Sequence, residues 1–253
     1  MPYVFNHPIL IFVVSLSVFW LSSAIGTWLS KHSRASEGDE AEYFKFVLGS
    51  VLTLLALIVG FTFSMAVNRY DHRKNLEEEE ANAIGTEYVR ADLLPASDST
   101  KVRALLKNYL SQRILAYRSR DEQRLQEISA ETARLQTEMW SAVAGSGGDT
   151  LSPLKALAVA GMNDVLNSQG YTQAAWLDRI PVAAWTLLFV ISIFSNLLIG
   201  YSMRTKSVLN AIVLPVALSV SFFLIADIDS PRHGVIRVHP QNLEVLSQSL
   251  TSQ

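Results

Sequence analysis

Four long apolar runs dominate the sequence, at residues 9–29, 46–67, 180–201 and 208–226. None of them contains Asp, Glu, Lys or Arg, and their lengths are 21, 22, 22 and 19 residues. Because an α-helix rises ~1.5 Å per residue, each run can cross a hydrocarbon core ~30 Å thick. The chain is therefore expected to be an integral membrane protein with four transmembrane helices in the lipid bilayer.

The four runs form two pairs around a charged middle segment. We predict an all-α protein with a transmembrane pair in residues 1–67, a helical domain in 68–179, a transmembrane hairpin in 180–229 and a tail in 230–253. The middle segment has 112 residues, which is enough for a folded unit. The first run is longer than the ~7–15 apolar residues of a signal-peptide core, and no basic residue precedes it, so a membrane helix is the simpler interpretation.

Composition excludes several classes of function. The net charge of −2 gives no indication of a nucleic-acid partner. The chain has no cysteine, which excludes disulfides, thiolate catalysis and Cys-ligated metals. The five histidines lack ligand spacing, and the common hydrolase, phosphate-loop and metalloprotease motifs are absent. We therefore predict no enzyme activity, no catalytic residues, no metal site and no cofactor.

The even number of spans places residues 68–179 and both chain ends on the same side of the membrane. Near the spans, that side carries six basic residues and the other side carries five. This difference is a weak positive-inside signal. We therefore expect residues 68–179 to be cytoplasmic.

The second span is predicted to continue into the middle segment as a single helix. No proline interrupts the sequence between Phe46 and Ile84, so we expect the helix to end near Pro95. Residues 77–80 place four glutamates in one turn, which repel one another unless cations or basic side chains lie close.

Helix signals continue downstream. Asp98-Ser99-Thr100 is predicted to cap a helix with apolar residues at helical spacing behind it. Residues 145–148 read Gly-Ser-Gly-Gly and predict a break. Ser152-Pro153 is predicted to open another helix that reaches about Gln169.

One face of the second span carries small or modestly polar residues at helical spacing. These are Gly49, Thr53, Ala56, Gly60, Ser64 and Asn68. The face either lines a narrow pathway or allows helices to pack closely in lipid, and on the stripe alone packing is the simpler interpretation. A neighbouring face carries Ile58, Phe61 and Met65. Around an axis these side chains would form a dewetting constriction; otherwise they contact lipid or another helix.

Polar residues follow this span. Arg69 and Arg73 are one turn apart, and they either attract anions at a pore mouth or anchor the helix at the membrane surface. A polar stripe then follows at helical spacing: Asn75, Glu79, Asn82, Thr86 and Arg90. Such a stripe either lines a wet vestibule or faces solvent.

The fourth span ends in an acidic motif that contains Asp227, Asp229 and Arg232. Two carboxylates at this position could hold a cation through oxygen ligands. The favoured alternative is helix termination, with the acids paired to Arg69, Arg73, Arg232 or Arg237. The spacing does not match a calcium loop.

Residues 60–73, which read GFTFSMAVNRYDHR, resemble the end of the second membrane helix of bacterial bestrophins. The Asp-Ile-Asp-Ser-Pro segment at 227–231 resembles the acidic segment after their last span. Residues 80–86 and 90–94, together with 229–238, are similar to an uncharacterised bacterial family named bestrophin-like. That second similarity extends over nearly the whole chain.

The resemblance implies an ion channel of the bacterial inner membrane that assembles as a homo-oligomer, a pentamer in bestrophins. It also implies that the second helix surrounds the pathway for inorganic ions. The chain departs from the bestrophin pattern at Lys74-Asn75, where bestrophins have a Trp pair. The alternatives are a non-conducting scaffold whose 68–179 domain binds a protein and, as a third possibility, an enzyme acting on lipid.

Overall fold

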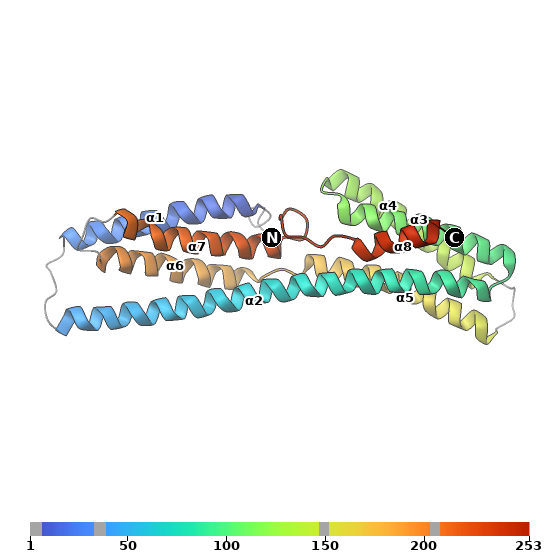
Figure 1. The fold of residues 1–253 in the computed structure, drawn as a ribbon, viewed down its shortest axis with the longest axis horizontal. Helices are drawn as coiled ribbons and strands as arrows, with labels where there is room; N and C mark the ends of the chain where they lie inside the picture. Colours follow the sequence, from blue (N-terminus) through green and yellow to red (C-terminus); the bar gives the residue numbers. More distant parts are fainter. Residues whose placement is uncertain (1–6, 33–38, 147–151, 203–207, 253) are drawn as a thin grey trace. The chain divides into compact units, whose positions relative to one another are not determined.

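The structure is a computed structural model in which every regular element is a helix (Figure 1). No strand occurs in the part of the chain that it describes, in agreement with the predicted all-α fold. The connection between the third and fourth apolar runs falls outside the described residues except for Ser202, and so do two glycines of the predicted break, Gly147 and Gly148. The described ranges are 7–32, 39–146, 152–202 and 208–252.

The chain divides into two compact units. The first contains Met1–Arg69 and Arg179–Arg237, and the second contains Tyr70–Asp178 and Val238–Gln253. Each unit is described separately below.

Among the described residues, four helical stretches are long and apolar enough to cross a membrane, as predicted, and their apolar parts lie in the first unit. They are α1 (Pro8–His32), the first part of α2 (Asp39–Arg90), α6 (Val182–Ser202) and α7 (Val208–Asp229). The third run was expected to become helical at residue 180, but α6 begins two residues later. The reason is that Ile180 precedes a proline and donates its backbone N–H to the Asp229 carboxylate, at 3.2 Å.

Helix α1 packs against both α6 and α7. The rings of Phe19, Phe189 and Phe222 meet at its centre, with centroid separations of 4.8, 5.2 and 6.0 Å. Aromatic pairs at these separations attract one another beyond the area that they bury. The three rings therefore join the three helices in one aromatic layer.

Helices α1 and α6 touch through their backbones at two glycines. A Cβ atom on Gly26 would overlap the carbonyl oxygen of Leu197, and one on Gly200 would overlap the carbonyl oxygen of Ser23. Helix pairs in lipid commonly associate through such small residues, because backbone contact maximises dispersion attraction.

The second unit has a helical core. It contains the second part of α2, the short 3₁₀ helix η2 (Ala91–Leu93), α3 (Ala96–Arg118), α4 (Glu122–Ala144), α5 (Pro153–Leu177) and α8 (Gln241–Thr251). The interior is mostly apolar. Several of its side chains have no exposed surface or almost none: Ile84, Leu106, Tyr109, Leu110, Met139, Met162, Val165 and Leu243.

The predicted helix boundaries in this unit are partly correct. Helix α2 runs without a break from the first unit to Arg90, as expected. Helix α3 begins at Ala96, directly after Pro95, so the prediction that Asp98-Ser99-Thr100 caps it was wrong. Asp98 lies inside the first turn instead, where its carboxylate accepts a hydrogen bond of 2.8 Å from Ser146.

The start of α5 follows the prediction. The Ser152 hydroxyl accepts a hydrogen bond of 3.1 Å from the backbone N–H of Lys155, and Pro153 is the first helical residue. The helix continues two turns beyond Gln169, to Leu177. Those turns are held by packing, since the Trp176 ring lies against the Tyr117 ring with a centroid separation of 4.9 Å.

We predict that Gly26→Ala weakens the contact between α1 and α6. The new methyl group must push two backbones apart, and overpacking of this kind typically costs about 1–3 kcal/mol. The thermal midpoint of the detergent-solubilised protein should therefore fall. Gly170→Ala is the matched control, because a Cβ there meets no atom within 4 Å. An equal effect of the two variants would contradict the backbone contact.

Candidate functional site

Helix α2 is the least covered of the four apolar helices. Only 11% of its most apolar 18-residue stretch is buried, against 50% of the corresponding stretch that ends at Asp229 in α7. Its buried side within the membrane unit is formed by Leu55, Thr62 and Ala66. The remainder of this stretch is exposed or half-buried in the single chain.

The stripe of small residues lies on the open side. All six members, from Gly49 to Asn68, are exposed. A Cβ atom on Gly49 or on Gly60 would meet no atom within 4 Å. Close packing inside one protomer therefore does not explain these small residues, whereas the glycines of α1 and α6 are explained in that way.

The apolar residues beside the stripe are also open. Phe61 is 64% exposed and Met65 is 39% exposed, while Ile58 is half-buried. At 100° per residue, Phe61 lies between the small-residue stripe and the buried side of the helix. Large apolar groups and small polar groups are thus presented side by side.

The polar stripe beyond the span is exposed as well. Asn75, Glu79, Asn82 and Thr86 all have open side chains. Arg90 at its end is half-buried, and its guanidinium lies 4.0 Å from the Asp164 carboxylate on α5. Helix α2 therefore presents open polar residues in both units.

The two arginines after the span have different environments. Arg69 is half-buried, whereas Arg73 is only 2% exposed. Burial takes the Arg73 guanidinium off the open face of α2, so Arg69 is the better placed of the two to meet solvent.

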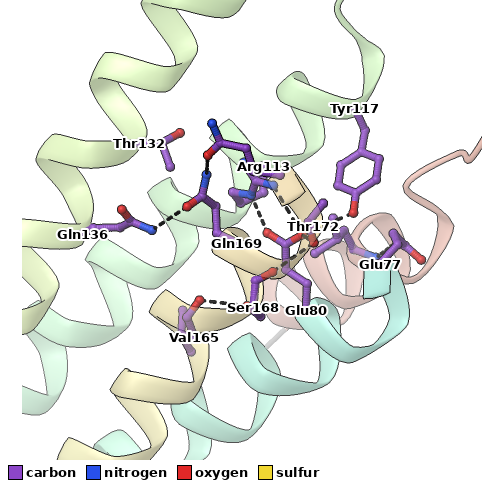
Figure 2. Close-up of polar contacts among 12 residues, drawn as sticks. Glu77, Glu80, Arg113, Tyr117, Thr132, Gln136, Val165, Ser168, Gln169 and Thr172 are labelled. Atoms are coloured by element: carbon purple, nitrogen blue, oxygen red, sulfur yellow. Dashed lines mark hydrogen bonds and ion pairs between the residues drawn. The ribbon is translucent and has the colours of Figure 1, made fainter. Parts of the chain in front are cut away.

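A buried ion pair holds α2 within the second unit (Figure 2). Arg113 of α3 donates to both oxygens of Glu80, through Nε to Oε1 and through Nη2 to Oε2 at 3.4 Å. Both side chains are buried. A buried carboxylate needs this pairing because removing a charge from water is costly.

Two hydroxyl groups complete the surroundings of Glu80 (Figure 2). Tyr117 of α3 donates to its Oε2 at 3.3 Å, and Thr172 of α5 donates to the same oxygen at 3.2 Å. Burial, and next the nearby Glu80 charge, raise the pKa of Tyr117, so the phenol stays neutral and keeps its proton. Glu80 therefore joins α2 to α3 and α5.

A second acidic residue of the same turn holds the C-terminal helix. Glu77 accepts a hydrogen bond from the backbone N–H of Leu243 at 3.0 Å and another from the Asn242 amide at 2.7 Å. A carboxylate at the N-terminus of α8 is favoured by the helix dipole and by the unpaired N–H groups there. Arg118 and Glu244 add an ion pair of 2.8 Å between α3 and α8.

These contacts explain the cluster of four glutamates. Glu77 and Glu80 are buried and fully engaged, whereas Glu78 and Glu79 are exposed to solvent. The sequence indicated that the cluster needs nearby partners, but it could not identify them. Arg113, Thr172 and Leu243 lie 33, 92 and 166 residues away from their partners in the chain.

The acidic motif after α7 is a helix terminus. The two Asp227 oxygens accept hydrogen bonds from the backbone N–H groups of Val235, at 2.8 Å, and Ile236, at 2.7 Å. The Asp229 carboxylate lies 3.8 Å from Arg179, whose guanidinium also donates to the Asp229 carbonyl at 2.9 Å. Arg179, the arginine beside Asp229, is not among the four arginines that the sequence analysis proposed as partners of these acids.

This arrangement supports the helix-termination interpretation of the motif. Each Asp227 oxygen accepts a hydrogen bond from the backbone of the turn that follows the helix, which is the role of a helix-terminating side chain. In the described ranges, no group of three or more His, Asp or Glu side chains is placed to hold a metal ion. Arg232 is half-buried in the same turn region.

Comparison with known proteins identifies relatives at the level of the family and of the fold. The Bestrophin-like domain matches residues 10–243. A mutant of a bacterial bestrophin homologue from Klebsiella pneumoniae matches with a TM-score of 0.66 and 15% identity, over 96% of this chain and 99% of that chain. Another structure of a bestrophin homologue from that organism gives 0.65 and 15%, over 96% and 97%. A structure described as a membrane protein gives 0.65 and 17%, over 95% and 97%. No curated protein matches the chain.

We predict that Arg113→Met lowers the free energy of unfolding of the second unit by about 3–5 kcal/mol, because it leaves Glu80 charged, buried and without its main partner. Glu80→Gln in the Arg113→Met background should recover part of this loss, since an amide keeps an acceptor for Tyr117 and Thr172 without a charge. Chemical unfolding monitored by tryptophan fluorescence measures both effects.

The control is Arg134→Met, which removes a pairing with Glu131 and Glu138 at the surface. Exposed pairs contribute little to stability because water and salt screen them, so this variant should unfold almost like the wild type. If the loss of unfolding free energy in the Arg113→Met/Glu80→Gln double variant equals the sum of the losses in the two single variants, Glu80 and Arg113 do not interact.

Proposed function

Because the chain belongs to the Bestrophin-like family, we propose that it forms an oligomeric ion channel in the bacterial inner membrane, with α2 lining the pathway. The observation that carries this proposal is the open face of α2. A stripe of small and polar residues, with bulky apolar residues beside it, is left uncovered on a helix long enough to cross the membrane.

A ring of α2 helices around an axis gives each part of this face a role. The small residues, represented by Gly60 and Ser64, allow neighbouring copies of α2 to approach closely. Ile58, Phe61 and Met65 form an apolar constriction from which water is readily excluded. Ser64 and Asn68 then supply the first polar contacts below the constriction.

The polar stripe of α2 continues the pathway in this proposal. Asn75, Glu79, Asn82 and Thr86 line a wet vestibule, and Arg69 stands at its entrance. Neutral amide and hydroxyl groups can replace part of the water around an ion without holding it tightly. Arg90 is partly engaged by Asp164, so its charge contributes less than that of a free guanidinium.

The number of subunits rests on the resemblance to bestrophins, which implies a pentamer. Identical copies related by a rotation axis place the same residue of each copy around the centre. The copies of one short side chain, one from each subunit, can therefore form a complete ring around the axis. For this reason one open helix face in each subunit is enough to line a pathway.

We predict that Phe61→Ala raises the ion flux of proteoliposomes. Removing the largest apolar group of the constriction lowers the cost of keeping water and ions inside it. The flux of several salts should be measured for wild type, for the variant and for empty liposomes.

The control for this measurement is Phe194→Ala, which truncates an exposed phenylalanine of α6. It should leave the flux unchanged. If wild type and Phe61→Ala carry no flux above empty liposomes while the protein is oligomeric, conduction is ruled out and the scaffold interpretation replaces it.

Topology gives a separate prediction. With residues 68–179 in the cytoplasm, a cysteine at Ser36 should react with an impermeant thiol reagent added outside intact spheroplasts. A cysteine at Ser129, which is exposed on α4, should react only after the membrane is opened. The chain has no native cysteine, so each label reports one position. Reversed labelling would contradict the proposed orientation.

A further inference from the structure

Helix α2 carries one buried carboxylate that neither the proposed pathway nor the Glu80 pairing uses. Glu87 has no exposed surface. Neither of its carboxylate oxygens has a hydrogen-bond partner in the described part of the chain. Buried polar groups are almost always hydrogen-bonded, and a bare buried charge is strongly unfavourable. The site therefore suits a neutral acid better than an ion.

Helix α5 makes room for this carboxyl group at a single residue. A Cβ atom on Gly161 would overlap Oε2 of Glu87 and also Nη1 of Arg90. Both side chains of α2 thus lie directly against the bare backbone of α5. The position and charge of the Glu87 side chain therefore affect the contact between α2 and α5 at this point.

The charged groups around Glu87 do not neutralise it. Arg90, on the same helix, lies beside it but also faces Asp164 of α5 at 4.0 Å. Burial raises the pKa of Glu87 to about 8, with Arg90 opposing this shift and Asp164 adding to it.

We propose that Glu87 is a proton-operated latch between α2 and α5: the protonated acid lets α5 close on α2 at Gly161, and loss of the proton loosens this contact. The proton leaves to solvent, and the resulting carboxylate is stabilised when it reaches water. It can do so only if the backbone of α5 at Gly161 moves away from α2. The inference concerns the second unit alone and does not depend on ion conduction.

The direction of the pH dependence follows from linkage. The closed state keeps the proton up to about pH 8, while in the open state the carboxyl returns toward its ordinary pKa of 4.5. Between these values opening releases one proton, so the opening equilibrium rises about tenfold for each pH unit. Above about pH 8 the group is ionised in both states and the dependence ends.

The first test compares unfolding of the full-length protein at several pH values between 5 and 9 for wild type and for Glu87→Gln. Glutamine has the shape of the protonated acid but cannot ionise. The unfolding equilibrium constant of the wild type should rise relative to that of Glu87→Gln by about tenfold per pH unit and level off near pH 8. Glu78→Gln, at an exposed glutamate of the same helix, should retain the wild-type pH dependence.

The second test measures local opening. Ala158 is fully buried on α5, one turn before Gly161, and a cysteine there would be the single thiol of the chain. The alkylation rate of this cysteine should be measured at each pH in the wild-type and Glu87→Gln backgrounds. The ratio of the wild-type rate to the Glu87→Gln rate removes the effect of the ionisation of the thiol itself.

A ratio that rises with pH and levels off near pH 8 supports the latch. A ratio that stays constant, or wild-type and Glu87→Gln proteins whose unfolding depends on pH in the same way, would overturn it. If the cysteine variant does not fold, the unfolding comparison decides alone.

Discussion

Helix α2 is held on one side and left open on the other, and the proposed function depends on this asymmetry. Leu55, Thr62 and Ala66 are its buried residues in the membrane unit, while Glu77 and Glu80 fix it in the second unit. In lipid, an uncovered apolar helix is stable without partners, so the small and polar residues on the open face need a separate cause. In the proposed channel, close approach of further copies of α2 would supply that cause.

The buried polar contacts of the second unit set the rotation of α2 about its axis. Arg113 joins Glu80 to α3, and Thr172 joins it to α5. Rotating α2 about its axis would therefore leave a buried charge without its partners. A hydrophobic core alone tolerates small rotations, because apolar contacts have little directionality. Glu87 adds a third buried group on the same helix, whose charge depends on pH. Directional contacts thus determine which residues of α2 stay open in the second unit.

Much of the fold could be predicted from local patterns. The apolar runs located the membrane helices, and the Ser152-Pro153 signal located the start of α5, because these signals lie in adjacent residues. The partners of Glu77, Glu80 and Asp229 could not be predicted, since they are distant in sequence and many basic or neutral donors could pair with each acid. The spacing of the stripe on α2 showed which residues share a face but not that the face is open. Its role as an ion pathway remains a prediction.

The most direct measurement of the central claim is disulfide cross-linking of α2 in native membranes. Ser64→Cys places the single thiol of the chain in the open stripe, while Val190→Cys places it on an exposed part of α6. A disulfide requires Cα atoms within about 7 Å of each other, so it reports close approach of two copies. If α2 surrounds an axis, mild oxidation should convert Ser64→Cys to covalent dimers and leave Val190→Cys monomeric. Efficient cross-linking at Val190 with none at Ser64 would contradict the account.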